Sequence, residues 1–420
     1  MSQSTTGTVL GHRKESSPSF YIALIYIVSL LLFNISNHLI PHILFLVWIV
    51  SAFLFDSKAL LSILSRKYYM ALYVFLLYYF VSSLLAFSPG TCVNRVYTYF
   101  ELISPFIMYE LYSKYDDKKK VLLCVVFLVV FVLNFYQMMT TINYSAIAGL
   151  RQHEDEEGFL NTGFHFVYSL TLVFCLIVYI IRQKLKKGDN NVFLMAGLFI
   201  WLMFIALIVF KSLFTTAILL MLVGAVLAFF YGRKHWKRKI LITGVVASFL
   251  FIYGVPFVEK QLLQMDSEYA IITSRLDDIS NAMQGGDMDD DSSMGARFNR
   301  SILSLKTFFS YPLFGVNHLT ANRDIFDAVL IGNHAEWVDS MAEYGIFAFL
   351  LFFFFIKSAK LVARKRGVTV VFILYVIIGF LNPVLYCVQN TICFFIIPMI
   401  YDLLLPQDSK VGQINLVNNG

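Results

Sequence analysis

The stretch VFLMAGLFIWLMFIALIVF at residues 192–210 contains no charged side chain and is followed by Lys211. A helix of about 20 apolar residues crosses the hydrocarbon core of a bilayer while satisfying its own backbone hydrogen bonds. Apolar runs of similar length recur along most of the chain. The sequence therefore predicts an all-α integral membrane protein, built as a bundle of transmembrane helices.

The composition supports the same prediction. Of 420 residues, 58% are hydrophobic, 17% are aromatic and only 14% are charged, and the mean hydropathy is +0.70. Soluble domains carry about 25% charged residues. The five cysteines lie in or beside apolar runs without metal-type spacing, so we interpret them as small core residues.

The basic residues predict the topology, because they mark the cytoplasmic loops of membrane proteins. Twelve spans with both termini in the cytoplasm place every basic cluster on one side. The clusters are Arg13-Lys14, Lys58 with Arg66-Lys67, Lys118 to Lys120, Arg182 to Lys187, Arg233 to Lys239, and Lys357 to Arg366. The formal charge of +6 is thus concentrated at the cytoplasmic face, which favours the membrane surface and argues against nucleic-acid binding.

Four parts make up the predicted organisation. Residues 1–256 hold helices 1–9 with short loops, and residues 257–343 form one large extracytoplasmic loop between helices 9 and 10. Residues 344–405 hold helices 10–12, and residues 406–420 form a cytoplasmic tail. No compact set of metal ligands, phosphate-cradling glycine loop or cofactor fingerprint is recognisable in the sequence, so we expect neither a metal nor a cofactor.

Two isolated cations stand out near predicted helix ends. Lys211 is flanked by apolar runs, and Arg95 lies in the predicted loop before helix 4. Each has a structural interpretation, in which the side chain simply extends to the membrane interface. Each also has a functional one, in which it holds an anionic or acceptor group just outside the bilayer.

The long loop contains a second basic feature. Arg297 and Arg300 lie one helical turn apart in a predicted amphipathic helix that ends at a Pro/Gly turn, residues 311–315. Planar guanidinium groups bind phosphate oxygens in pairs, which suits these arginines to a diphosphate at a membrane surface.

His334 is the best candidate for a general base, because imidazole takes up protons near neutral pH. Glu336, Asp339 and Glu343 follow it and are candidates to hold or orient the ring. The structural alternative is that a loop histidine beside carboxylates is merely solvated.

Residues 297–345 resemble the signature of the O-antigen ligase and polymerase superfamily. The shared features are an arginine, a helix, a Pro-Leu-x-Gly-Val turn and a histidine that leads to Glu-x-Gly. Here they are Arg297, residues 312–316, His334 and residues 343–345. Arg151 ahead of helix 6 and the basic Lys211 are weaker similarities.

The resemblance implies a bacterial inner-membrane glycosyltransferase with its active site on the extracytoplasmic face. Its donor would be a polyprenyl (undecaprenyl) diphosphate-linked glycan and its acceptor a glycan or a lipid-linked hydroxyl, with His334 as the base. Lys211, Arg297 and Arg300 would bind the diphosphate, without metal or cofactor. A flippase and a chain-length regulator are the expected protein partners.

Two departures qualify the resemblance. Family members commonly carry arginine where this chain has Lys211, and ligases often have asparagine where it has Ala335. The second departure favours a polymerase of O-antigen or capsule repeat units over an O-antigen ligase that transfers finished polysaccharide to lipid A-core or another acceptor.

Two functions of other classes remain open. A small-anion transporter would place ionisable residues near the membrane midplane, whereas this sequence concentrates them in its predicted loops. A non-catalytic assembly scaffold would not need His334, so a His334 variant distinguishes it from an enzyme.

Overall fold

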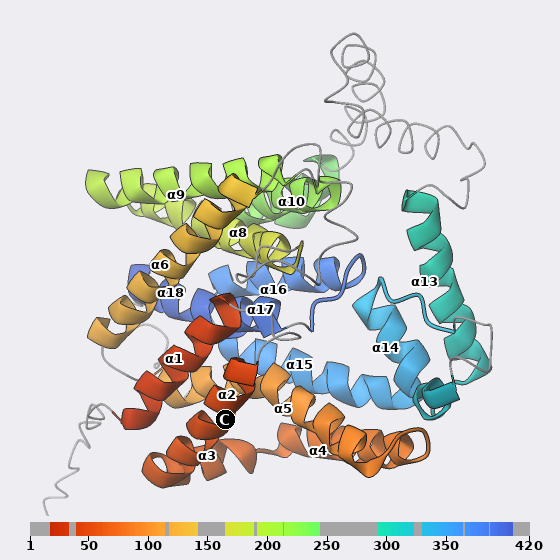
Figure 1. The fold of residues 1–420 in the computed structure, drawn as a ribbon. Coiled ribbons are helices and arrows are strands. Elements are labelled where there is room, and N and C mark those ends of the chain that lie inside the picture. Colours follow the sequence, from red (N-terminus) through yellow and green to blue (C-terminus); the bar gives the residue numbers. More distant parts are fainter. Residues whose placement is uncertain are drawn as a thin grey trace, which may run out of the picture.

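The computed structural model describes residues 17–32, 39–113, 117–141, 164–188, 191–212, 214–243, 293–322, 330–363, 366–385 and 387–405. Every regular element in these ranges is helical (Figure 1). The α-helices before the long loop are α1 (Pro18–Leu32), α2 (Leu39–Phe55), α3 (Ser57–Leu64), α4 (Lys67–Leu84), α5 (Pro89–Tyr112), α6 (Asp117–Thr141), α8 (Phe164–Lys187), α9 (Val192–Lys211) and α10 (Thr215–Phe230). The later elements are α13 (Ser293–Ser310), the 3-10 helix η4 (Asn317–Asn322), α14 (Glu336–Tyr344), the 3-10 turn η5 (Gly345–Phe347), α15 (Ala348–Val362), α16 (Arg366–Gly379), α17 (Cys387–Thr391), the π-helical η6 (Ile392–Ile396) and α18 (Ile397–Leu404).

Within the described ranges, four helical stretches are long and apolar enough to cross a membrane. They are Asp117–Tyr136, His165–Lys187, Val192–Phe210 and Glu336–Val362. A fifth is possible if α2 and α3, bent by 107° at Asp56, form one broken span. The chain is therefore an α-helical, multi-pass membrane protein, as its sequence predicts. The count of twelve spans, and the limits of the loop at residues 257–343, stay predictions.

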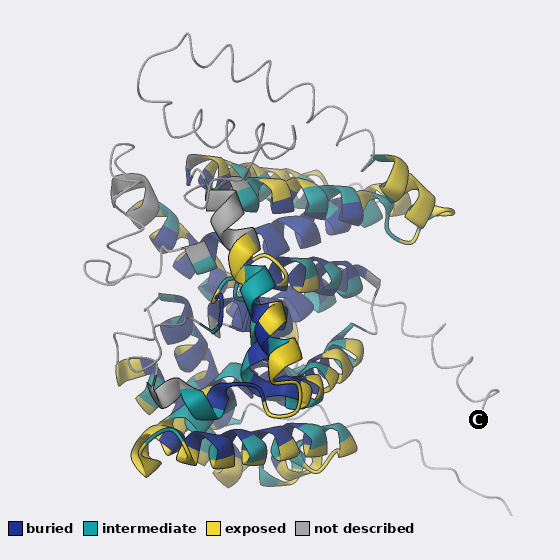
Figure 2. Cartoon of the chain, turned by 90° about the vertical axis from the view of Figure 1, so that its right-hand side faces the viewer, coloured by how far each residue is buried: buried dark blue, intermediate teal, exposed yellow. Residues whose placement is uncertain are grey.

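Helix α8 lies at the centre of the bundle and α9 at its surface. The apolar window of α8 is 83% buried and that of α9 only 22% buried, and α8 packs against α9, α10 and α16. Exposed side chains on α9 are large and apolar, with Phe193 and Met203 among them. Figure 2 shows the buried residues gathered in the interior helices and the exposed ones on the outer helices. Such a surface is stable against lipid tails rather than water, so α9 faces the bilayer.

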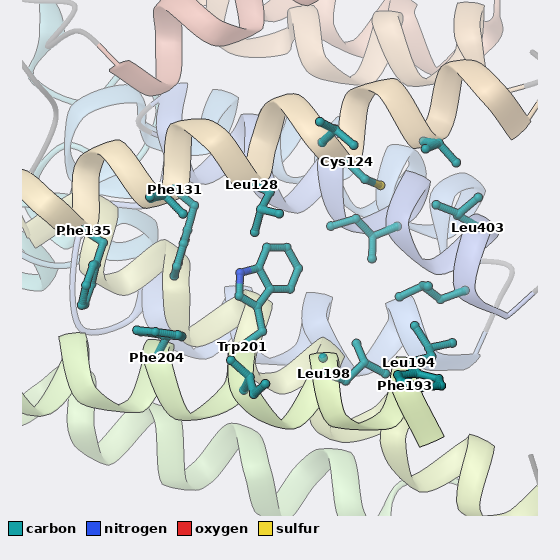
Figure 3. A pocket seen from close by; sticks show the side chains of 17 residues that line it. Cys124, Leu128, Phe131, Phe135, Phe193, Leu194, Leu198, Trp201, Phe204 and Leu403 are labelled. Carbon is teal, nitrogen blue, oxygen red and sulfur yellow. The ribbon is translucent and has the colours of Figure 1, made fainter. Parts of the chain in front are cut away.

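An apolar cavity of about 610 Å³ lies between α6, α9 and α18. Figure 3 shows the Trp201 ring extending from α9 toward α6 into this space. The lining side chains are almost all hydrocarbon or aromatic, as suits the lipid-facing side of a membrane bundle.

Helices α13 and α14 gather at one end of the bundle, where α13 runs across the direction of α15 (Figure 1). Hydrogen bonds attach this region to the spans. Among them, Asn317 Nδ2 donates to Ser82 Oγ at 2.6 Å, and Trp337 Nε1 donates to the carbonyl of Val376 at 2.8 Å. The part of the long loop that the structure describes is thus docked on α4 and α16.

Candidate functional site

The segment before α14 lies directly against α13. The hydroxyl of Ser304 accepts the backbone N–H of Gly332 at 2.9 Å, and Thr307 Oγ1 donates to the carbonyl of Leu330 at 2.6 Å. A β carbon on Gly332 would lie 2.3 Å from the carbonyl oxygen of Arg300. Glycine is therefore required at position 332 for the two backbones to approach this closely.

Asp339 holds the turn that carries His334. Its Oδ2 accepts the backbone N–H of Ala335 at 2.7 Å, and its Oδ1 accepts the hydroxyl of Ser304 at 2.5 Å. The same carboxylate also accepts hydrogen bonds from the backbone N–H groups of Asn333 and His334. Asn333 adopts a left-handed conformation with φ of 57°. A carboxylate in the first turn of α14 also complements the helix dipole. The backbone on both sides of His334 is thus fixed by one side chain.

Arg300 contacts the ring of His334, with 2.7 Å between Nη1 and Nε2. A guanidinium is permanently charged and has only donors, so Nε2 must offer its lone pair. The contact selects a neutral imidazole protonated at Nδ1. Arg300 is solvent-exposed and His334 half-buried, so both can meet a ligand at this end of the bundle.

Glu336, two residues after His334, is directed to the segment between α16 and α17. Its Oε2 accepts the backbone N–H groups of Val384 and Leu385 at 3.1 and 3.3 Å. The neighbouring Trp337 packs on Gly379, where a β carbon would lie 2.3 Å from the indole nitrogen. These contacts give Glu336 a role in fixing α14 to the bundle.

Glu343 pairs with Arg95 of α5 at 3.3 Å, and Arg95 Nε also donates to the hydroxyl of Tyr79 at 2.8 Å. The hydroxyls of Tyr99 and Tyr344 are 2.7 Å apart in the adjoining aromatic cluster. The two predicted site residues Arg95 and Glu343 are thus brought together by the fold, at the junction of α5 with α14. The prediction of a loop at Arg95 was wrong, because α5 already begins at Pro89, where Ser88 caps the helix by accepting the N–H of Thr91.

Two glycines join the halves of the sequence signature. Gly315 and Gly345 have φ of 59° and 58°, and a β carbon on Gly315 would lie 2.3 Å from the carbonyl oxygen of Glu343. The backbone N–H of Ile346 donates to the carbonyl of Pro312 at 2.8 Å. The Pro-Leu-x-Gly-Val turn therefore packs closely on the Glu-x-Gly segment through backbone contacts.

The remaining predicted residues are placed less completely. Lys211 is the last residue of α9, and Arg297 lies in α13 one turn before Arg300, but their side chains fall outside the described part of the structure. Arg151 is outside the described residues altogether. The ring of Phe214, just after Lys211, stacks on Tyr168 of α8 at 6.5 Å between centroids.

One part-buried pair was not predicted from the sequence. Glu101 on α5 is fully buried, and its Oε1 lies 2.8 Å from Nδ1 of His42 on α2. The signal was present, since Glu101 is a lone acid among apolar residues, and an ionisable residue at membrane depth calls for a partner.

The fold defines a multi-pass α-helical membrane protein with an arginine–histidine pair on one end of its bundle. Residues 198–353 match the family described as O-antigen ligase. The match includes α13, the His334 turn, α14 and the Glu-x-Gly segment, and it confirms the resemblance to the O-antigen ligase and polymerase superfamily. No curated protein matches the chain.

Proposed function

We propose that this protein is a glycosyltransferase that polymerises the repeat units of O-antigen or capsule on a polyprenyl diphosphate carrier. The donor is the diphosphate-linked glycan, and the acceptor is a sugar hydroxyl of another glycan. The observation that carries the proposal is the contact between Arg300 and His334 within the stretch that matches the O-antigen ligase family.

In this mechanism His334 is the general base. Its Nε2 takes the proton of the acceptor hydroxyl while the hydroxyl oxygen forms a bond to the anomeric carbon of the donor. The bond from that carbon to the diphosphate breaks, and the diphosphate leaves with the electron pair. The proton remains on His334 until it is lost to water.

Arg300 serves two steps of this mechanism. In the structure it donates to Nε2 of His334, so that the lone pair is occupied. A diphosphate offers a guanidinium charged oxygens in a bidentate geometry, which are stronger partners than a neutral imidazole. Donor binding therefore draws Arg300 to the phosphate and frees His334 for the acceptor.

Arg297 and Lys211 complete the anion site in the proposal. Arg297 is one turn from Arg300 on α13, and Lys211 ends α9 at the turn into α10. Cations aimed at the departing phosphate stabilise the charge that develops there, which is a large contribution to catalysis.

Asp339, Glu336, Glu343 and Arg95 are positioning residues in this scheme. Asp339 fixes the His334 turn, and the Arg95–Glu343 pair fixes the end of α14 against α5. The proposed location is the bacterial inner membrane with the site on its outer face, where a flippase would deliver the donor and a chain-length regulator would act on the product.

The second candidate is an O-antigen ligase that transfers finished polysaccharide to lipid A-core or another acceptor. The same base and anion site would serve it. We favour the polymerase because Ala335 stands where ligases often have asparagine.

The experiment is glycan profiling on gels from cells that lack the gene and express wild type, His334→Ala or His318→Ala at equal levels. His318 is the matched control, because it lies in η4 of the same loop. We expect His334→Ala to leave single repeats on the lipid carrier and His318→Ala to restore the polymer. Polymer that accumulates on the carrier would indicate a ligase, and full complementation by His334→Ala would refute the base.

A further inference from the structure

The cavity between α6, α9 and α18 has the dimensions of a binding site for a hydrocarbon chain. Its volume is about 610 Å³, within the roughly 300–1,000 Å³ of ligand-binding cavities. On α6 its lining extends from Val121 to Phe135, which at about 1.5 Å per residue is a length of about 21 Å. One leaflet supplies about half of the roughly 30 Å hydrocarbon core of a bilayer. The cavity is therefore long enough for one extended acyl chain.

The cavity is filled by aromatic rings at one end and open at the other. The ring centroids of Trp201 and Phe131 are 5.8 Å apart, and those of Phe135 and Phe204 are 5.4 Å apart, so these rings bridge α6 and α9 (Figure 3). Nearer the start of α9, Gly197 also lines the cavity, and an added β carbon there would have no atom within 4 Å. The open space thus lies toward the starts of α6 and α9.

Positive charge gathers at this open end. Lys118 is exposed and lies one turn before the first lining residue of α6, on the same face of the helix. Lys186 and Lys187 are exposed in the last turn of α8, and α9 begins five residues later. The third wall of the cavity, α18, packs on both α6 and α8. These lysines therefore surround the end of the cavity at which a lipid headgroup would lie.

Acidic side chains do not cancel this charge. Among the described residues, the first turn of α6 and the last turns of α8 and α18 contain six lysines and two aspartates. One of the aspartates, Asp117, pairs with Lys120 at 3.5 Å, and the other lies on α18. A net positive end on an apolar cavity fits an amphiphile with an anionic headgroup.

The proposed diphosphate site lies elsewhere in the bundle. Figure 1 shows α18 at one end of the bundle and α13, which carries Arg300, at the opposite end. Basic residues mark the predicted cytoplasmic side, where the leaflet carries anionic phospholipids. A donor whose diphosphate is bound at Arg300 would hold its charge far from these lysines, so the open end of the cavity fits a different anion.

We propose that the cavity binds one anionic diacyl phospholipid of the cytoplasmic leaflet. One acyl chain lies between α6 and α9, and the phosphate lies at Lys118, Lys186 and Lys187. The chain gains dispersion contacts with the apolar lining, and the ammonium groups donate to the phosphate oxygens. A zwitterionic phospholipid makes the same apolar contacts but gains less from the lysines. This site is independent of the glycosyltransferase proposal.

The test uses Trp201 as a reporter, because its ring extends into the cavity (Figure 3). The full-length protein is reconstituted in phosphatidylcholine vesicles that contain increasing fractions of phosphatidylglycerol brominated on its acyl chains, since bromine quenches indole fluorescence. Subtraction of the signal of a Trp201→Phe protein removes the other three tryptophans. We expect half-quenching at a mole fraction about fivefold lower for brominated phosphatidylglycerol than for brominated phosphatidylcholine, the factor expected for one lysine at a membrane surface.

The headgroup contacts are tested by a triple variant, Lys118→Gln with Lys186→Gln and Lys187→Gln. It should be quenched equally by the two brominated lipids. The control is Lys357→Gln with Lys360→Gln, because these exposed lysines lie on α15, which does not line the cavity. The control should keep the preference of the wild type for phosphatidylglycerol.

The chain site is tested by Gly197→Phe, which places a ring in the open space without displacing a neighbouring atom at its β carbon. We expect it to lower the quenching of Trp201 by brominated phosphatidylglycerol. Met203→Phe is the control, because Met203 lies on the same helix, is exposed and does not line the cavity. Each variant is compared with its own Trp201→Phe form, and Gly197→Leu replaces Gly197→Phe if the latter does not purify.

Equal quenching of the wild type by the two lipids overturns the phospholipid site, as does a preference that survives the triple lysine substitution. Unchanged quenching in Gly197→Phe also overturns it. The tail of the lipid-linked donor is the alternative occupant. If a polyprenyl diphosphate displaces brominated phosphatidylglycerol at a lower mole fraction than unlabelled phosphatidylglycerol does, the cavity belongs to that tail and the proposal is wrong.

Discussion

Gly315 and Gly345 meet backbone to backbone, since a β carbon on Gly345 would lie 2.7 Å from the amide nitrogen of Gly315. One glycine ends the turn after α13 and the other ends α14, so their contact fixes the distance between these helices. Arg300 lies on α13, and His334 lies in the turn directly before α14. The geometry of the arginine–histidine pair therefore depends on two residues that take no part in the chemistry.

We expect Gly345→Ala to lower the unfolding temperature and abolish polymer formation. Its φ of 58° with ψ of −138° is accessible essentially to glycine alone, and a side chain there costs on the order of 1–3 kcal/mol in strain before the steric clash is counted. The measurement is thermal unfolding of detergent-purified protein, followed by size-exclusion chromatography.

The control for this substitution is Gly90→Ala. Gly90 lies in α5 with no atom within 4 Å of an added β carbon, and a helical alanine is favoured over glycine by about 0.5–1 kcal/mol. It should match or exceed wild type in stability. A Gly345→Ala protein as stable as wild type would contradict the backbone contact.

Substitution of Arg300 tests the double role of its guanidinium. Arg300→Lys keeps the charge but loses the planar pair of donors, so we expect turnover to fall about tenfold. Arg300→Gln also loses the charge, so we expect turnover to fall about 100-fold or more. The measurement is the rate of consumption of lipid-linked donor by purified protein. Equal rates for wild type and Arg300→Gln would exclude Arg300 from the diphosphate site.

Asp339 should act on turnover through the position of His334. Asp339→Ala removes the acceptor for the backbone N–H groups of the turn. We therefore expect kcat to fall strongly while KM for the donor changes little. Asp339→Asn keeps one acceptor oxygen, so it should recover part of the rate. Asp117→Ala is the control, because the Asp117 side chain at the start of α6 is largely exposed. A rise in KM with kcat unchanged would instead place Asp339 in donor binding.

Much of this architecture follows from local sequence patterns. The apolar run at 192–210 predicts a span, and the structure has α9 there. The spacing of Arg297 and Arg300 before a Pro/Gly turn predicts a helix, and α13 ends at Ser310 just ahead of that turn. These predictions succeed because helical periodicity and turn residues act over a few neighbouring positions.

The partners of each charged residue could not be predicted in the same way. Arg300 and His334 are 34 residues apart, and their contact depends on the close approach of α13 to Gly332. Helical spacing places Glu336 near Asp339 on α14, but the choice of Val384 and Leu385 as its partners comes from packing between distant segments. Such pairings follow from tertiary structure, which periodicity does not encode.

The pair of Glu101 and His42 gives the last prediction, which concerns stability within the bundle. Glu101 is fully buried, its Oε2 has no partner among the described residues, and its Oε1 lies 2.8 Å from His42. Removal of one member of a buried pair costs about 3–5 kcal/mol, whereas replacement of both by apolar side chains is often neutral. We therefore expect His42→Leu, which leaves the fully buried carboxyl of Glu101 without this partner, to unfold at a clearly lower temperature, and the double variant with Glu101→Leu to recover most of the loss. Thermal unfolding of both proteins in the same detergent measures this coupling, and additive losses in the double variant would show that the two side chains do not stabilise each other.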